Sequence, residues 1–223
     1  MIISFGGHDF FLHHSGALFW PSESMLIVSD LHLEKGSHFA RRGFFLPPYD
    51  SHYTISRLAD VCQELQCKKL LLLGDAFHDE KGFGRLGKRE RAMFKSLLAF
   101  HPIWIRGNHD RDFVPEGFYA ADIYAHKGIT FRHETAPDAL LDISGHFHPK
   151  VDITNGQKRL SSHCFIEDGQ KMIVPAFGAF TGGLDITDPA IRRLLRPNYR
   201  IYPLGKTRVY RMNTEVFKLK AEK

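Results

Sequence analysis

The stretch KLLLLGD (residues 69–75) joins four consecutive leucines to a glycine and an aspartate. A short apolar run that ends in a turn signal is typical of a strand buried on both faces of a sheet. The segments before and after it, SHYTISRLADVCQEL (51–65) and KRERAMFKSLLAF (88–100), repeat apolar side chains at helical spacing. The leucine run is therefore predicted to be a buried strand between two helices that each bury one face.

Similar apolar strands are predicted on either side, at MLIVSD (25–30) and PIWIRGNHD (102–110). This strand–helix alternation predicts parallel pairing through right-handed crossovers. The first twenty residues are instead predicted to form short strands with hairpin turns, and the chain after about residue 120 a strand-rich half. We expect an α/β (α+β) core with a second sheet in a single domain, 1–223, whose basic, strand-rich C-terminal extension begins at about residue 189.

Composition excludes several classes of protein. Apolar residues make up 43% and charged residues 25% of the 223 residues, which is ordinary for a globular chain. The apolar runs are too short to span a membrane, and the first residues do not resemble a signal peptide. Three cysteines without a CxxC pattern provide neither a disulfide framework nor a thiolate metal site. A cytoplasmic location fits best, and the formal charge of +5 is a mild indication of a polyanionic partner.

Polar residues follow the predicted apolar strands at their carboxyl ends, the edge of an open α/β sheet where binding sites form. Side chains two residues apart on an extended segment point the same way, so each Asp-x-His or His-x-His pair could face one site, with Phe147 turned into the core. Oxygen and imidazole donors suit Mn²⁺, Fe or Zn²⁺. Seven donors are too many for one tetrahedral ion and suit two ions that share a carboxylate. The donors are Asp30, His32, Asp75, Asn108, His133, His146 and His148.

Each motif has an ordinary structural alternative. Asp-x-His is more often a cap or a surface pair than a ligand set, and Gly-Asp is commonly a turn. His133 taken alone fits a partly buried histidine, whereas Gly-Asn-His-Asp contains an imidazole that a turn does not need. Five such motifs at successive strand ends favour a metal centre.

In this order the motifs Asp-x-His, Gly-Asp, Gly-Asn-His-Asp, a single His and Gly-His-x-His resemble those of the calcineurin-like metallophosphoesterase superfamily. The segments VSDLHLEKGSHFARRGFFLP, LLLGDAFHD and VPAFGAFTGGLD are similar to its bacterial ligase-associated, PdeM-type branch of DNA-repair phosphoesterases. The resemblance implies a four-layer αββα sandwich of two mixed β-sheets flanked by helices. Glu34 departs from the pattern, which has a small residue there, and is expected at the rim of the site.

The resemblance also implies the division of the ligands. Asp30, His32, Asp75 and His148 would hold one ion, and Asp75, Asn108, His133 and His146 the other. The implied metal is most simply Mn²⁺, with Fe or Zn²⁺ as alternatives. Asp75 would bridge the two ions, which would support in-line attack by a hydroxide held between them. His109 is not needed as a ligand and would act as a proton donor or charge stabiliser. Asp110 either orients His109 or only belongs to the same turn.

The substrate is less constrained. Basic residues cluster at 81–95 and 189–214, where they either bind phosphates or form a solvated surface. Lys35, Arg41 and Arg42 follow the first metal loop and are the better candidates for phosphate contact. We expect a phosphodiesterase or nuclease acting on DNA ends or single strands; the alternatives are a phosphatase or pyrophosphatase for a small metabolite, and a binding module without catalysis, which the complete ligand set disfavours. Association with a DNA ligase or helicase is implied by the resemblance alone.

Overall fold

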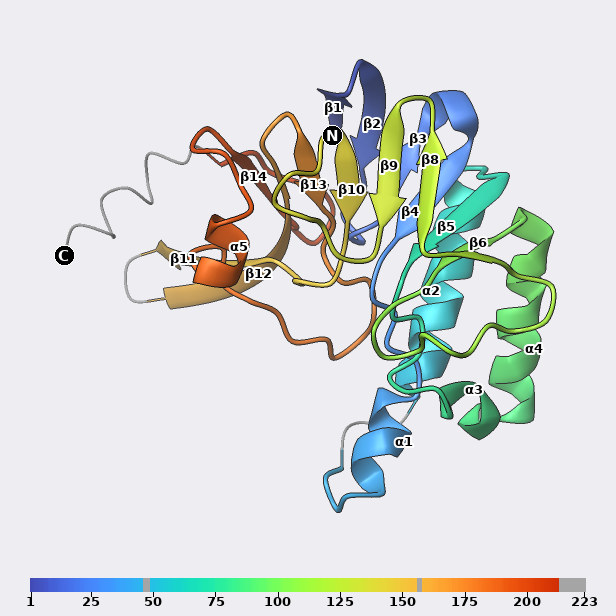
Figure 1. Ribbon diagram of the computed structural model, residues 1–223. Helices are drawn as coiled ribbons and strands as arrows, with labels where there is room; N and C mark the ends of the chain where they lie inside the picture. The colour runs from blue at the N-terminus through green and yellow to red at the C-terminus, as the bar shows by residue number, and fades with distance from the viewer. Residues whose placement is uncertain (46–48, 156–157, 213–223) are drawn as a thin grey trace.

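Two β-sheets pack face to face in the computed structural model, which describes residues 1–45, 49–155 and 158–212, and helices lie outside them (Figure 1). The first sheet has the order β1-β2-β3-β4-β5-β6-β7. Its first four strands are antiparallel neighbours, whereas β4, β5, β6 and β7 are parallel. The strands are β1 (Ile2–Phe5), β2 (His8–Leu12), β3 (Leu18–Trp20), β4 (Met25–Val28), β5 (Lys69–Leu73), β6 (Ile103–Ile105) and β7 (Tyr119–Ala121).

The second sheet has the order β11-β12-β13-β10-β9-β8, and β14 pairs with β12. It is also mixed, because β9, β10 and β13 are parallel and the other pairs are antiparallel. Its strands are β8 (Ile123–His126), β9 (Ile129–Arg132), β10 (Asp142–Ser144), β11 (Lys150–Asn155), β12 (Lys158–Glu167), β13 (Lys171–Ile173) and β14 (Arg200–Pro203).

Strands β4 and β5 are buried on both faces. Leu70 and Leu72 of β5 pack toward α2 (Asp50–Glu64) and α4 (Lys88–Ser96), while Leu71 and Leu73 pack against the second sheet. Both faces of the leucine run are buried, so all of its side chains are removed from water. Burial of each leucine stabilises the folded protein by about 1.5–3 kcal/mol. The predicted buried strand between two helices is confirmed.

The outer helices are unequal. Besides α2 and α4, the first sheet carries two short helices, α1 (Lys35–Ala40) and α3 (Gly82–Arg85), near the carboxyl ends of its parallel strands (Figure 1). Among the described residues, α5 (Pro189–Arg192) and its flanking loops cover the second sheet, through Ile191 and Leu194. The predicted sandwich of two mixed sheets flanked by helices is confirmed. The described part of the expected C-terminal extension supplies α5 and β14, and β14 belongs to the second sheet; residues 213–223 lie outside the described residues.

Sequence periodicity did not predict α1, α3 or the strands β7 and β8. Helix α1 has six residues and α3 has four, too short for an amphipathic pattern. Strand β7 has only three residues, and in β8 exposed side chains alternate with half-buried ones at the sheet edge. In the described part of the chain, no helix combines the length and the apolar character that a bilayer crossing requires.

Glu23 ties the two sheets together on the side away from the parallel strand ends. It ends the 3₁₀ helix η1 (Pro21–Glu23) before β4, accepts from His126 Nε2 of β8 at 2.7 Å, and pairs with Lys127. Lys69 of β5 lies 3.7 Å away. Hydrogen bonds from Lys127 and His126 lower the pKa of Glu23 to about 2. The ionised carboxylate therefore stabilises the contact between the sheets.

Replacing Glu23 with Gln is expected to lower the free energy of unfolding by about 1–2 kcal/mol at pH 7, with the exposure of both lysines limiting the loss. Because the folded pKa is depressed, this contribution is present above the unfolded pKa of Glu and fades as pH falls from about 4.5 to 2. Urea unfolding of wild type and Glu23→Gln across that range measures it. The matched control is Glu116→Gln, at an exposed site; an equal loss in both variants would contradict the tie.

Candidate metal centre

The polar loops of both sheets meet at one edge. Asp30 and Asp75 lie two residues beyond β4 and β5, and Asn108 lies three residues beyond β6. His133 directly follows β9, and His146 lies two residues beyond β10. Since these strands are parallel within each sheet, their carboxyl ends open onto the same cavity of about 330 Å³. The two sheets thus contribute to one site.

Asp30, His32 and His148 form one group of donors. His148 Nε2 lies 3.1 Å and His32 Nε2 lies 3.9 Å from Asp30 Oδ1. The two Nε2 atoms are themselves 3.3 Å apart. Three donor atoms therefore converge on one small volume.

Asp75, His133 and His146 form a second group, beside Asn108. His133 Nε2 lies 3.4 Å from Asp75 Oδ2 and 3.1 Å from His146 Nδ1. The Oδ1 atom of Asn108 lies 2.9 Å from His133 Nε2 and 3.1 Å from His146 Nδ1. Asp75 Oδ2 is also 3.9 Å from His32 Nε2 of the first group. All seven candidates are thus brought together, and Asp75 stands between the two groups.

The bonding of each carboxylate fits divalent cations. Asp30 Oδ2 accepts from Ser29 Oγ and from the His146 amide at 2.9 Å, which leaves Oδ1 toward the imidazoles. Asp75 Oδ1 accepts the His109 amide at 2.9 Å, which leaves Oδ2 toward His32 and His133. One oxygen is fixed by the protein and the other faces nitrogen donors. Carboxylate, imidazole and amide oxygen together are a donor set for Mn²⁺, Fe or Zn²⁺.

His133 is oriented by its other ring nitrogen. Its Nδ1 lies 2.9 Å from the Leu73 carbonyl, so Nδ1 carries a hydrogen and Nε2 is the ring nitrogen directed at the site. Such a backbone acceptor fixes both the tautomer and the ring plane.

The backbone at the site is not extended. Asp30, His32, Asp75, His146 and His148 all have positive φ, between 42° and 69°. The predicted strand-like alternation of side chains is therefore wrong here, although Phe147 is buried as expected. Non-glycine residues in this region each cost about 1–3 kcal/mol and persist where surrounding contacts hold them.

Two glycines let the loops close around the carboxylates. A Cβ on Gly107 would lie 2.0 Å from Asp75 Oδ1, and one on Gly145 would lie 1.6 Å from Ser29 Oγ. Neither separation is possible without moving the loop, so only glycine permits this packing. The ordinary turn interpretation of these glycines is incomplete.

His109 borders the site from the third loop. Its Nδ1 lies 3.1 Å from the His78 carbonyl, its ring stacks on His78, and its Nε2 lies 3.9 Å from Asp75 Oδ2. The side chain is 40% exposed, which leaves it open to a ligand in the cavity. His32, Asp75 and His109 also form a third set of donors close enough for an ion.

Asp110 is buried and forms hydrogen bonds with backbone amides of neighbouring loops. Its carboxylate accepts the amides of Phe77 at 3.1 Å and Gly107 at 3.2 Å, and so joins the second and third loops. Burial, reinforced by the nearby Asp75 charge, raises the pKa of Asp110 to about 6. The sequence could not distinguish this contact from one to His109, because both require the same Asp after His109.

Burial and the two carboxylates have opposite effects on the pKa values of the neighbouring histidines. Burial alone would lower the pKa of His133, but the hydrogen bond to Asp75 and the Asp30 charge raise it to about 9. Burial and the charge of His148 lower the pKa of His32 to about 3, against the opposing field of Asp30. At neutral pH His133 thus carries a proton and His32 is neutral, so ligation of a cation by His133 would release that proton.

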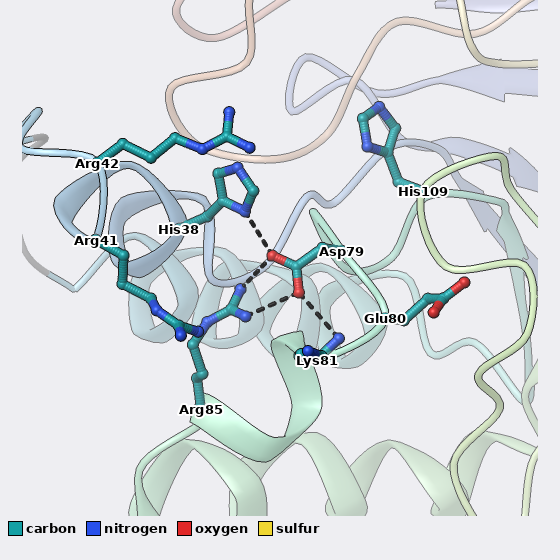
Figure 2. A pocket seen from close by; sticks show the side chains of 8 residues that line it. All are labelled: His38, Arg41, Arg42, Asp79, Glu80, Lys81, Arg85 and His109. Carbon is teal, nitrogen blue, oxygen red and sulfur yellow. Dashed lines mark hydrogen bonds and ion pairs between the residues drawn. The ribbon is translucent and has the colours of Figure 1, made fainter.

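The residues predicted to contact the substrate phosphate line two different cavities. Lys35 lines the metal cavity and donates to the Phe180 carbonyl at 3.0 Å. Arg41 and Arg42 line a neighbouring cavity that also contains His109 (Figure 2). Glu34 lines neither, since it bonds to Ser51 Oγ at 2.9 Å and borders a third cavity. Sequence reasoning missed Ser29, whose only signal was its position directly before Asp30.

A fold of two mixed sheets that delivers carboxylates and imidazoles to one edge defines a metal-dependent phosphoester hydrolase. Residues 24–201 match the calcineurin-like phosphoesterase family, and the chain belongs to that family. The chain is also similar to the solved nuclease MPE of Pseudomonas putida, with 27% identity, a TM-score of 0.72 and coverage of 95% of this chain and 99% of that one.

A conserved uncharacterized protein from Streptococcus pneumoniae is more distant, with 12% identity, a TM-score of 0.31 and coverage of 86% and 89%, and carries no argument here. No curated protein matches the chain.

Ligands and non-ligands at the site are expected to separate by metal content. Asp75→Asn and Asn108→Ala should lose activity together with bound metal, because each removes a donor. His109→Ala should lose about 10²–10⁴-fold in rate and keep its metal, because it removes only proton transfer. Elemental analysis and turnover after Mn²⁺ reconstitution measure both. Wild-type turnover by His109→Ala, or metal loss in it, would contradict the assignment.

Proposed function

We propose that this protein is a nuclease that hydrolyses phosphodiester bonds of DNA with two divalent cations. The observation that carries the proposal is the pair of donor groups around Asp75. The metal cavity that they line adjoins a basic cavity, and His109 lines both. The similarity to the Pseudomonas putida nuclease along almost the whole chain supports a nucleic-acid substrate.

The ligands divide as the two groups suggest. Asp30, His32 and His148 would hold one cation, and Asn108, His133 and His146 the other, with Asp75 shared. When bound, the cations supply electrophilic stabilisation of the phosphoryl charge and a nucleophile formed from water at neutral pH. Mn²⁺ is the metal we propose, with Fe and Zn²⁺ as alternatives for the same donors.

His109 would transfer a proton to the leaving oxygen. Its Nδ1 is committed to the His78 carbonyl, so Nε2 is the atom that holds the mobile proton. That atom lies at the exposed edge of the site, 3.9 Å from Asp75 Oδ2, where a substrate oxygen can reach it. Asp110 would act as a positioning residue that fixes the loop carrying His109, through the amides of Phe77 and Gly107.

Lys35 would contact the scissile phosphate. Its ammonium group is half-buried at the metal cavity and already donates to the Phe180 carbonyl, so a phosphate oxygen would be a second acceptor for its remaining hydrogens. A DNA-repair role, a cytoplasmic location, the PdeM-type branch and association with a ligase or helicase are further parts of the proposal, supported by the sequence motifs alone.

The proposal predicts a substrate preference. With Mn²⁺ supplied, the protein should hydrolyse bis(p-nitrophenyl) phosphate and single-stranded oligonucleotides, and should prefer the diester to p-nitrophenyl phosphate. Chelation should abolish both activities and Mn²⁺ should restore them. Preference for the monoester, with no cleavage of any oligonucleotide, would instead support a phosphatase for a small metabolite; His109→Ala is the matched inactive control.

A further inference from the structure

A second cavity, of about 390 Å³, adjoins the metal cavity. The side chain of His109 lines both cavities, and Figure 2 shows it among the residues of the second one. The second cavity lies between α1 and α3 and contains none of the seven candidate metal ligands. It is therefore a separate compartment beside the reaction centre.

Four permanently cationic side chains line this cavity against two carboxylates. Arg41, Arg42, Lys81 and Arg85 supply the positive charges, and Asp79 and Glu80 the negative ones. Two positive charges thus have no carboxylate to balance them inside the cavity. Like charges at close range repel unless an anion joins them.

Asp79 is fully engaged and cannot balance the remaining arginines. Arg85 binds it with two parallel hydrogen bonds of 2.8 and 2.7 Å, and His38 Nδ1 lies 2.6 Å from the same carboxylate. In Figure 2 the dashed lines from Asp79 reach His38, Arg85 and Lys81, and none reaches Arg41 or Arg42. These two arginines are exposed and have no ion-pair partner among the described residues.

The same Asp79 network fixes the helix that carries the free arginines. His38 belongs to α1, and Arg85 Nε also donates to Ser37 Oγ of α1 at 2.8 Å. A six-residue helix would fray without such contacts. Arg41 and Arg42 directly follow Ala40, the last residue of this anchored helix, and their guanidinium groups form no ion pair with the described residues.

The cavity on the opposite side of α1 has the other charge. It has a similar volume of about 400 Å³, but Glu34, Asp50 and Glu90 line it. An anion is therefore attracted to one side of α1 and repelled from the other. The two cavities beside α1 therefore differ in the sign of the charge that lines them.

We infer that the basic cavity is a second anion subsite, which binds the phosphate next to the scissile one through Arg41 and Arg42. Arginine suits this task because its planar fork donates two hydrogen bonds to phosphate oxygens. The inference rests on the proposed nuclease function and specifies its substrate: a polynucleotide fills both cavities, whereas an ester with a single phosphate fills only the metal cavity.

Binding is measured first, without metal, so that no substrate is cleaved. A fluorescent single-stranded oligonucleotide should bind the Arg41→Gln/Arg42→Gln variant about 10-fold or more weakly than wild type, and the magnitude of the negative slope of log K against log salt should fall by about 1.4. The matched control removes two exposed charges elsewhere, Lys68→Gln/Lys206→Gln. An equal loss in the control would overturn the subsite in favour of a general attraction by net charge.

Cleavage is measured second, with Mn²⁺. The ratio of kcat/KM for the oligonucleotide to that for bis(p-nitrophenyl) phosphate should fall about 10-fold or more in the Arg41→Gln/Arg42→Gln variant and stay at the wild-type value in the control. A proportional loss on both substrates would overturn the subsite, because it would mean a damaged metal centre. Unfolding midpoints of all three proteins verify that each is folded.

A neutral linkage in the substrate locates the contact. Replacing one phosphate by methylphosphonate should slow wild-type cleavage of one adjacent bond about as much as the double substitution does, and should slow the variant little further. Additive losses would overturn the direct contact.

The failures are distinguishable. Oligonucleotide cleavage by wild type with no change in the variant removes only the subsite, whereas hydrolysis of the small diester without any oligonucleotide binding or cleavage removes the nuclease function as well.

Discussion

The Asp75 carboxylate is the constraint on which the site depends. One of its oxygens accepts the His109 amide, and the other faces imidazoles that come from both sheets. This geometry requires the third loop to pass so close that residue 107 has no room for a Cβ. Asp75, at the end of β5, is thus contacted by groups from the loops after β4, β6 and β9.

The strands that hold these loops are the part that sequence predicts best. The leucine run 70–73, buried on both faces, is visible as an uninterrupted apolar segment, and polar residues at its carboxyl end mark the edge where a site forms. The pattern therefore indicated both sheets and the positions of all seven candidate ligands along the chain. Local sequence patterns were enough to predict these positions, because the carboxyl ends of parallel strands lie at the same edge of a sheet.

What the sequence could not indicate depends on contacts between distant segments. The left-handed backbone at Asp30, His32 and His148 departs from a strand pattern, since loop closure rather than propensity determines it. The Asp79 contacts with His38 and Arg85 join residues 41 and 6 positions apart, and neither spacing has a local signature. Asp110 likewise binds amides 33 and 3 residues away, which no motif beside His109 reveals.

The donors of the candidate metal centre come from both sheets: Asp30, Asp75 and Asn108 follow the first, and His133 and His146 follow the second. A cation held by this set would link the two sheets at the edge opposite the ion pairs of Glu23. Metal supply would then govern lifetime as well as turnover, because binding to the folded form alone shifts the folding equilibrium.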